Sequence, residues 1–430
     1  MEIAPWLITI GFVLILGFIG NYIFNKKQIP SILWLLLSGL AIGYIFRFSE
    51  LVSNYTSLFG DISALVGAIA IIIILFDGGI NTDIYQLFRG APRGLLMTLS
   101  SFLFSFFGTM ILILVLDFLN VISINGDSLI IGAMLGAIVG GTSSPIVIPL
   151  AYKLKNLQDK TKMLASIESI LTDPICIVVA FAISYMVLTL GEINLVLGIG
   201  NVVKTFSVGI VLGLAVGFIW LFIMNKVRKE KFSYILTLAV TFLVYAATVF
   251  LVGTNQGGEG AGAIACLMFG LVLGNGKKVL KMVNYSGKGF EMDDQTKQFH
   301  GLMSFMIRTF FFVYLGLLVS TLKIQPEFIL IGIIVIIILI IFRYLAVELS
   351  TYKGNFERDD KQTMLVMMPR GLAAAILAIT FGKEFLNEEL FIGVAFVVIL
   401  GTAVITTVGV TYICHNENKK NNQKNDNLIS

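Results

Sequence analysis

The chain has 430 residues and a formal net charge of +4; 57% of its residues are hydrophobic and only 13% are charged. Soluble proteins average about 25% charged residues, and together with a mean hydropathy of +0.92 this composition excludes an ordinary soluble domain. We predict an all-α polytopic membrane protein that contacts the lipid bilayer along most of its length.

Apolar stretches follow one another along the whole chain. A helix needs about 20 predominantly apolar residues to cross the hydrocarbon core of a bilayer. By this criterion we expect about thirteen transmembrane helices, at residues 3–24, 30–47, 58–80, 92–116, 128–150, 163–190, 195–224, 233–252, 260–275, 299–320, 327–350, 362–382 and 389–413.

The basic residues of the connections predict the orientation of the chain. Every second connection is rich in lysine and arginine, beginning with Lys26 and Lys27, whereas the intervening connections together hold only Arg47, Lys323 and Lys383. Connections rich in basic residues stay in the cytoplasm. We therefore expect a multi-pass protein of the plasma membrane with its N-terminus outside and its C-terminus inside. The polar segment 415–430 has too few apolar residues to pack, so we predict a disordered cytoplasmic tail.

Charged residues occur inside the predicted spans. A charge near the bilayer centre costs about 2.5–3.5 kcal/mol on insertion scales, so such a residue is expected to be paired or functional. A rise of about 1.5 Å per residue brings the charges of five spans to roughly one depth. These residues are Asp77, Glu168, Asp173, Arg308, Arg343 and Arg370.

The sixth span carries the most polar of these segments, SIESILTDP at 166–174. Ser169, Thr172 and Asp173 are three or four residues apart and share one helix face. Glu168 lies about 140° away from Asp173 around the helix. The two carboxylates therefore have different predicted roles.

Two spans contain helix-breaking segments at membrane depth. GGTSSP occupies 140–145 in the fifth span and PRG occupies 369–371 in the twelfth. Proline removes a backbone donor and clashes with the preceding turn. Interrupted spans in both halves of a chain indicate an inverted-repeat transporter whose binding site lies at the interruptions.

Five short motifs follow one another along the chain. They are LFDGGI at 75–80, the serine-rich break of the fifth span, ESILTDP at 168–174, RTFFFVYLGLLV at 308–319 and PRGLAAAILA at 369–378. This pattern resembles the NhaP-type branch of the monovalent cation/proton antiporters, within the sodium/hydrogen exchanger superfamily. The resemblance covers nearly the whole chain.

The resemblance implies an antiporter fold in which two unwound helices cross. Core helices four to six would occupy 92–190, and core helices eleven to thirteen would occupy 327–414. Dimer-domain helices one to three would occupy 1–91, and helices seven to ten would occupy 195–320. It also implies a homodimer.

The resemblance further implies site residues. Asp173 would carry the cation and the proton, and Ser169, Thr172, Thr142, Ser143 and Asp77 would contribute further ligands, with Na⁺ held at Asp173, Ser169, Ser143 and Asp77. Glu168 and Arg343 would form a structural ion pair. Three positions depart from the family pattern: Thr172 replaces an asparagine, SSP at 143–145 replaces Thr-Asp-Pro, and Asp77 replaces a commoner glutamate.

The residues by themselves leave several roles open. Asp173 could be a structural acid neutralised by an arginine, and Asp77 could cap the end of the third span. Arg370 could balance the charge of an unwound segment or extend to the interface. Arg308 could serve packing or a core charge pair.

The predicted function is exchange of Na⁺ for H⁺, electroneutral because one acid carries both ions. Alkali cations prefer oxygen donors, and proton and cation compete for one buried carboxyl. K⁺/H⁺ exchange, a cation channel and an inactive sensor paralogue stay open as alternatives. No set of nucleophile, base and orienting group indicates an enzyme. We expect no resident cofactor and no nucleic-acid partner, only transported Na⁺ or K⁺ and H⁺.

Overall fold

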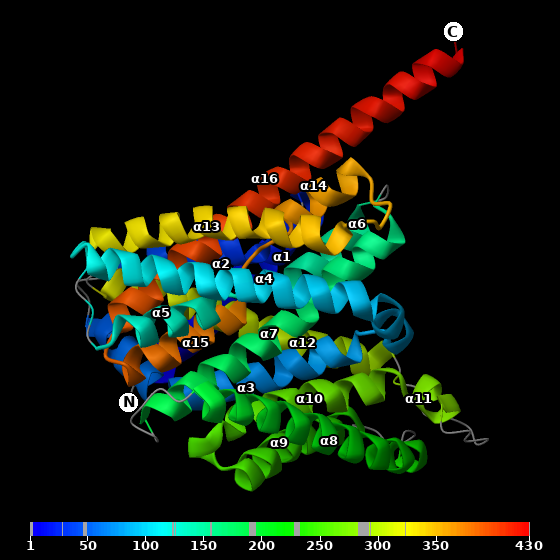
Figure 1. The fold of residues 1–430 in the computed structure, drawn as a ribbon. Helices are drawn as coiled ribbons and strands as arrows, with labels where there is room; N and C mark the ends of the chain where they lie inside the picture. The colour runs from blue at the N-terminus through cyan, green and yellow to red at the C-terminus, as the bar shows by residue number, and fades with distance from the viewer. Residues whose placement is uncertain are drawn as a thin grey trace.

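A computed structural model describes residues 3–27, 29–45, 50–122, 124, 126–154, 157–188, 195–227, 233–282, 292, 294–322 and 324–429. Every regular element in this part of the chain is a helix, which confirms the predicted all-α class. The helices run mostly along one direction and form a bundle (Figure 1).

The first half of the chain contains α1 (Ile3–Lys27), α2 (Ser31–Ile45), α3 (Glu50–Ile80), α4 (Ile84–Phe118), α5 (Ser128–Val139), α6 (Ser144–Lys153) and α7 (Asp159–Leu188). The second half contains α8 (Leu195–Val227), α9 (Ser233–Val252), the 3-10 turn η1 (Thr254–Gln256), α10 (Gly258–Gly274), α11 (Gly276–Met282), α12 (Asp294–Thr321), α13 (Pro326–Thr351), α14 (Arg358–Val366), α15 (Leu372–Glu384) and α16 (Glu388–Ile429).

Each of the thirteen predicted spans coincides with a helix or with a pair of helices separated by a break. Eight helical segments in the described residues are long and apolar enough to cross a membrane, and α1, α2 and α3 contain shorter apolar stretches. The count of thirteen crossings stays a prediction. The fifth and twelfth spans are the interrupted ones: they divide into α5 with α6 and α14 with α15.

The segment after residue 414 differs from the prediction of a disordered tail. α16 continues as a helix to Ile429, and its end projects beyond the bundle (Figure 1). Helix nucleation is the costly step, and adding residues to an existing helix avoids it. The apolar part of α16 therefore provides a helix that the polar residues extend.

The helices pack in two groups. In one group α4 contacts α5, α7 and α13, and α16 contacts α13 and α15. In the other, α10 contacts α3, α8 and α9, and α12 contacts α1 and α2. These groups correspond to the residues expected for the core and the dimer domain, although that division of roles stays a proposal.

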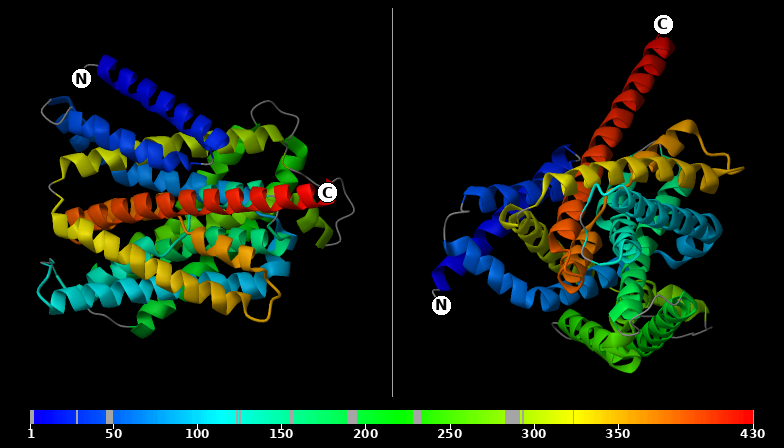
Figure 2. Two further views of the ribbon diagram at one scale, coloured as in Figure 1. Left: turned by 90° about the horizontal axis from the view of Figure 1, so that it is seen from above. Right: turned by 60° about the vertical axis from the view of Figure 1, so that its left-hand side comes forward.

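The two groups contact each other through helices in the interior of the bundle. α7 contacts α8 and α10, and α15 contacts α3 and α12. The start of α1 and the end of α16 lie at opposite ends of the bundle, and Figure 2 shows this from two further directions. These contacts bring α7, which carries Asp173, and α15, which follows the second break, against helices of the other group.

Candidate functional site

The two broken helices contact each other at their breaks. α5 ends at its cap residue Gly140, and α6 starts at Ser144 with a proline in its first turn. Residues 367–371 separate α14 from α15. The backbone N–H of Ser143 donates a hydrogen bond to the carbonyl oxygen of Pro369 across 2.8 Å. The interruptions that the sequence places in separate halves of the chain thus form one locus.

Arg370 closes the carbonyl end of α5. Its side chain is buried, with 2% of the residue exposed, and its Nη1 donates to the carbonyl oxygens of Gly140 at 3.1 Å and Gly141 at 2.7 Å. The C-terminal end of a helix carries a partial negative charge and unpaired carbonyl groups. A guanidinium at this place supplies both donors and positive charge.

Arg343 of α13 does the same for α14. Its Nε donates to the carbonyl oxygen of Met364 and its Nη2 to that of Met367, both at 2.9 Å. Its Nη1 forms a buried ion pair with the carboxylate of Glu168 on α7. The carbonyl end of each broken helix therefore faces an arginine, and Glu168 balances one of the two.

Thr172 holds the first break from the side of α7. Its hydroxyl accepts a hydrogen bond from the backbone N–H of Thr142 at 3.0 Å and lies 3.1 Å from the Thr142 hydroxyl. Both threonines are buried. Thr172 stands next to Asp173 in the sequence, but its oxygen is already engaged by the unwound backbone, and neither threonine lines the cavity described next.

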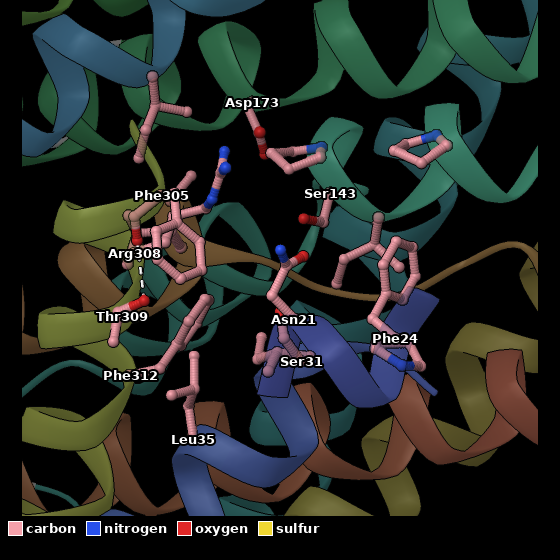
Figure 3. Close-up of a pocket in the computed structure, with 18 residues that line it drawn as sticks. Asn21, Phe24, Ser31, Leu35, Ser143, Asp173, Phe305, Arg308, Thr309 and Phe312 are labelled. Carbon is pink, nitrogen blue, oxygen red and sulfur yellow. Dashed lines mark hydrogen bonds between the residues drawn. The ribbon is translucent and has the colours of Figure 1, made fainter. Parts of the chain in front are cut away.

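Asp173 opens into a cavity of about 200 Å³ between the two helix groups (Figure 3). Ser143 lines the same cavity, together with residues of α1, α2, α3, α12 and α15. Gly141 approaches the acid so closely that a Cβ there would lie 3.0 Å from Asp173 Oδ1. The carboxylate therefore faces unwound backbone on one side and open space on the other.

Ser169, one turn before Asp173 on α7, is fully buried. Its hydroxyl donates to the carbonyl oxygen of Ser166 at 3.1 Å, and it is not among the residues that line the cavity. The three oxygen-bearing residues expected to act together are thus divided. Asp173 faces the cavity, Thr172 faces the break, and Ser169 is bonded within its own helix.

Asp77 and Arg308 lie together on α3 and α12. Arg308 Nη1 donates to the Ser304 hydroxyl at 2.9 Å. Asp77 accepts a hydrogen bond from Asn81 Nδ2 at 3.0 Å, bonds the Ser304 side chain and interacts with the charge of Arg308. Arg308 lines the cavity of Asp173, whereas Asp77 does not. The acid expected as a ligand is thus found beside an arginine.

Several cavity residues escape prediction from the sequence. Asn21 of α1 and Ser31 of α2 contribute polar atoms, and Thr309 lies beside Arg308 on α12 (Figure 3). Asn21 lies a few residues before a lysine pair, where a polar residue normally marks the end of a span. The sequence therefore contains no signal that distinguishes Asn21 from an ordinary interfacial residue.

Known proteins resemble this chain along nearly its full length. It is 24% identical over 407 residues to a protein named K(+)/H(+) antiporter NhaP of Alkalimonas amylolytica, an alignment that covers 93% of this chain and 64% of that protein. It is 25% identical over 388 residues to a protein named Na(+)/H(+) antiporter 1 of Methanocaldococcus jannaschii, covering 90% of this chain and 86% of the relative. The chain thus spans less than two thirds of the length of the Alkalimonas relative.

The fold also matches a solved structure. The sodium proton antiporter MjNhaP1 of Methanocaldococcus jannaschii superimposes with a TM-score of 0.76 at 22% sequence identity, covering 96% of this chain and 98% of that chain. The model of the family described as "Sodium/hydrogen exchanger, transmembrane" matches residues 11–415. With crossed helix breaks, a buried acid beside them and a match over this range, the chain belongs to the sodium/hydrogen exchanger family.

Proposed function

We propose that this protein exchanges Na⁺ for H⁺ across the membrane and that both ions compete for Asp173. The observation that carries the proposal is the position of this carboxylate. In the part of the chain that the structure describes, Asp173 is the only acidic residue that lines the cavity at the crossed helix breaks. Membership of the sodium/hydrogen exchanger family supports the same function.

The chemistry of the site suits an alkali cation as a transported substrate. Hard cations prefer oxygen donors, and the Asp173 carboxylate and the Ser143 hydroxyl both face the cavity. Ser169, Thr172 and Thr142 remain candidate ligands if the helices rearrange during transport. A proton on Asp173 removes the negative charge that holds the cation. One carboxylate therefore accepts one ion or the other, and exchange follows when it faces each side in turn.

The cavity suggests which side Asp173 faces. Its lining includes Asn21, Phe24, Pro30 and Ser31, which flank the connection between α1 and α2. Lys26 and Lys27 place this connection on the cytoplasmic side under the positive-inside rule. The conformation is then open toward the cytoplasm, and a movement of the core helices against the others would open Asp173 to the outside.

Replacement of the proposed carrier tests the proposal. We expect Asp173→Asn to abolish Na⁺-dependent proton movement in vesicles that contain a pH-sensitive dye, because an amide neither titrates nor supplies a negative charge. Asp159→Asn is the matched control, since Asp159 lies in the first turn of the same helix with its side chain fully exposed. Exchange retained by Asp173→Asn would overturn the proposal.

K⁺ is the second candidate cation. The Alkalimonas relative is named a K(+)/H(+) antiporter, and the donor atoms at Asp173 bind either ion. Pulses of Na⁺, K⁺ and Li⁺ on the same vesicles decide between them by the size of the pH response. A cation channel would instead give conductance without proton coupling, and an inactive paralogue would respond to none of the three.

We further propose a homodimer in the plasma membrane with the N-terminus outside, assembled through the group formed by α1–α3 and α8–α12. Exposed apolar residues on α8 and α9, such as Val196, Leu243 and Phe250, support a surface that meets lipid or a second copy. Native mass measurement in detergent is expected to give a dimer. Labelling of single cysteines introduced at 119 and 353 is expected to occur from outside and from inside, respectively.

A further inference from the structure

We propose that Arg308 acts as a tethered positive charge in the cavity and that Asp77 is its counter-charge, so that the pair sets the affinity of Asp173 for its ions. The inference rests on the proposed function of Asp173. It assigns Asp77 a role other than direct cation binding and gives Arg308 a role in affinity.

The position of Arg308 is the first step. Arg308 and Asp173 line the same cavity from opposite helix groups, Arg308 on α12 and Asp173 on α7. The Arg308 side chain extends into the space below Asp173 (Figure 3). The hydroxyl of Ser304, one turn earlier on α12, accepts a hydrogen bond from Arg308 Nη1 at 2.9 Å and holds the guanidinium in place. A cation in this cavity is therefore exposed to a positive charge as well as to the carboxylate.

The position of Asp77 is the second step. Asp77 does not line the cavity, and its partners are Ser304, Asn81 and the charge of Arg308. Ser304 accepts a hydrogen bond from Arg308 and also interacts with the side chain of Asp77, so it lies between the two charged residues. A carboxylate outside the cavity lining cannot touch a cation at Asp173 in this arrangement. It can still cancel the repulsion that Arg308 would otherwise exert there.

Arg370 is the positive charge that acts most directly on Asp173. It is bonded to the carbonyl oxygens of Gly140 and Gly141, so its influence is a fixed background. Arg308 differs from Arg370 in that a single acid, Asp77, balances its charge. A substitution of Asp77 or of Arg308 therefore changes the net charge around the cavity while the joint between the two helix breaks keeps its bonds.

The charge balance makes a quantitative prediction. An unscreened unit charge a few side chains away, at the effective dielectric constant typical of proteins, changes the affinity for a monovalent ion by on the order of tenfold. Na⁺ and H⁺ each bring one positive charge to Asp173, so both are weakened or strengthened by the same factor. At high pH, where no proton competes, the apparent KM for Na⁺ then changes by the whole of this factor. At low pH the apparent KM stays unchanged, because the change in Na⁺ affinity is cancelled by an equal change in the affinity of the competing proton.

The experiment compares four proteins in vesicles: the wild type, Asp77→Asn, Arg308→Gln and the double variant. At high pH we expect Asp77→Asn to raise the apparent KM for Na⁺ by on the order of tenfold and Arg308→Gln to lower it by a similar factor. The double variant should return to within about twofold of the wild type, because the two charges are removed together. The factor should be the same for Na⁺ and Li⁺, since a remote charge does not sense ion size.

Matched variants control for structural damage. Asp77→Glu and Arg308→Lys keep the charges and are expected to keep the wild-type KM. Glu348→Gln removes the acid of an ion pair far from the cavity lining, Glu348–Lys361 at 2.7 Å on α13 and α14, and is expected to leave the KM unchanged. These variants separate the charge in the cavity from the general loss of an ion pair.

Two results would overturn the inference. If Asp77→Asn lost Na⁺ binding and Arg308→Gln failed to restore it, Asp77 would be a ligand. If the KM shifts were equal at low and high pH, the effect would not be an electrostatic one shared by both ions. Both results are distinct from a failure of the proposed function, in which the wild type shows no exchange or Asp173→Asn retains it.

Discussion

Nη1 of Arg370 lies 2.7 Å from the carbonyl oxygen of Gly141, so a residue from the second helix break closes the end of the helix that precedes the first. Together with the bond from Ser143 to Pro369, this contact makes the two breaks depend on each other. The position of Asp173 depends in turn on this joint, because Gly141 packs against its carboxylate.

Removing the Arg370 guanidinium is expected to abolish exchange and to lower the stability of the fold. Hydrogen bonds to a charged donor contribute about 1.5–3 kcal/mol each. Arg370→Ala loses the two bonds to Gly140 and Gly141 and a longer one to the Ser105 hydroxyl. Arg370→Lys keeps the charge and should recover part of both properties. Thermal unfolding in detergent and vesicle exchange measure the two effects. Full exchange by Arg370→Ala with an unchanged melting temperature would contradict this prediction.

Replacing the Thr172 hydroxyl is expected to loosen the first break. Thr172→Val keeps the shape of the side chain but leaves the backbone N–H of Thr142 without its acceptor, at a cost of about 1–3 kcal/mol. Thr172→Ser should behave like the wild type. Thr411→Val serves as the control, since Thr411 is exposed and its hydroxyl donates to the carbonyl oxygen of Thr407 in its own helix. Equal melting temperatures for Thr172→Val and Thr411→Val would count against the role of Thr172.

Substitutions that break the buried pair of Glu168 and Arg343 are expected to destabilise the protein, and the size of the effect should differ between the two residues. Loss of one partner of a buried ion pair costs about 3–5 kcal/mol. Arg343→Met should cost more than Glu168→Gln, because it strands the carboxylate and also removes the donors to Met364 and Met367. The double variant should be more stable than Arg343→Met alone. Unfolding temperatures in detergent give this order, and a reversed order would contradict it.

The exchange is expected to be electroneutral. Asp173 is the only acid lining the cavity in the described residues, and Thr172 beside it is uncharged, so one proton leaves for each cation that binds. An imposed membrane potential should therefore leave the rate of Na⁺-driven proton movement unchanged. A rate that rises with potential would indicate that a second charge moves during the cycle.

The helical class and the location of the breaks could be predicted from the sequence because they depend on local properties. Whether a stretch crosses a membrane depends on the length of its apolar run, and proline with paired glycines interrupts a helix wherever it stands. The resemblance to a family around Asp173 and Arg370 could be predicted for the same reason, since the motifs that carry it are short and contiguous in the sequence.

The segment 415–429 shows the limit of such reasoning at a chain end. Its composition predicts disorder, yet it continues α16. A prediction from composition considers this segment by itself and does not take account of the helix that precedes it. A segment that would not nucleate by itself can still extend a helix that is already formed.

Tertiary structure alone decided what each polar side chain meets. Helical spacing puts Ser169, Thr172 and Asp173 on neighbouring positions of one helix, but it cannot say that Thr172 meets the backbone of Thr142 while Asp173 meets a cavity. It likewise cannot join Asp77 to Arg308. Periodicity fixes angles within one helix, whereas the partner of a side chain depends on how separate helices pack, and that packing is set by contacts between residues far apart in the chain.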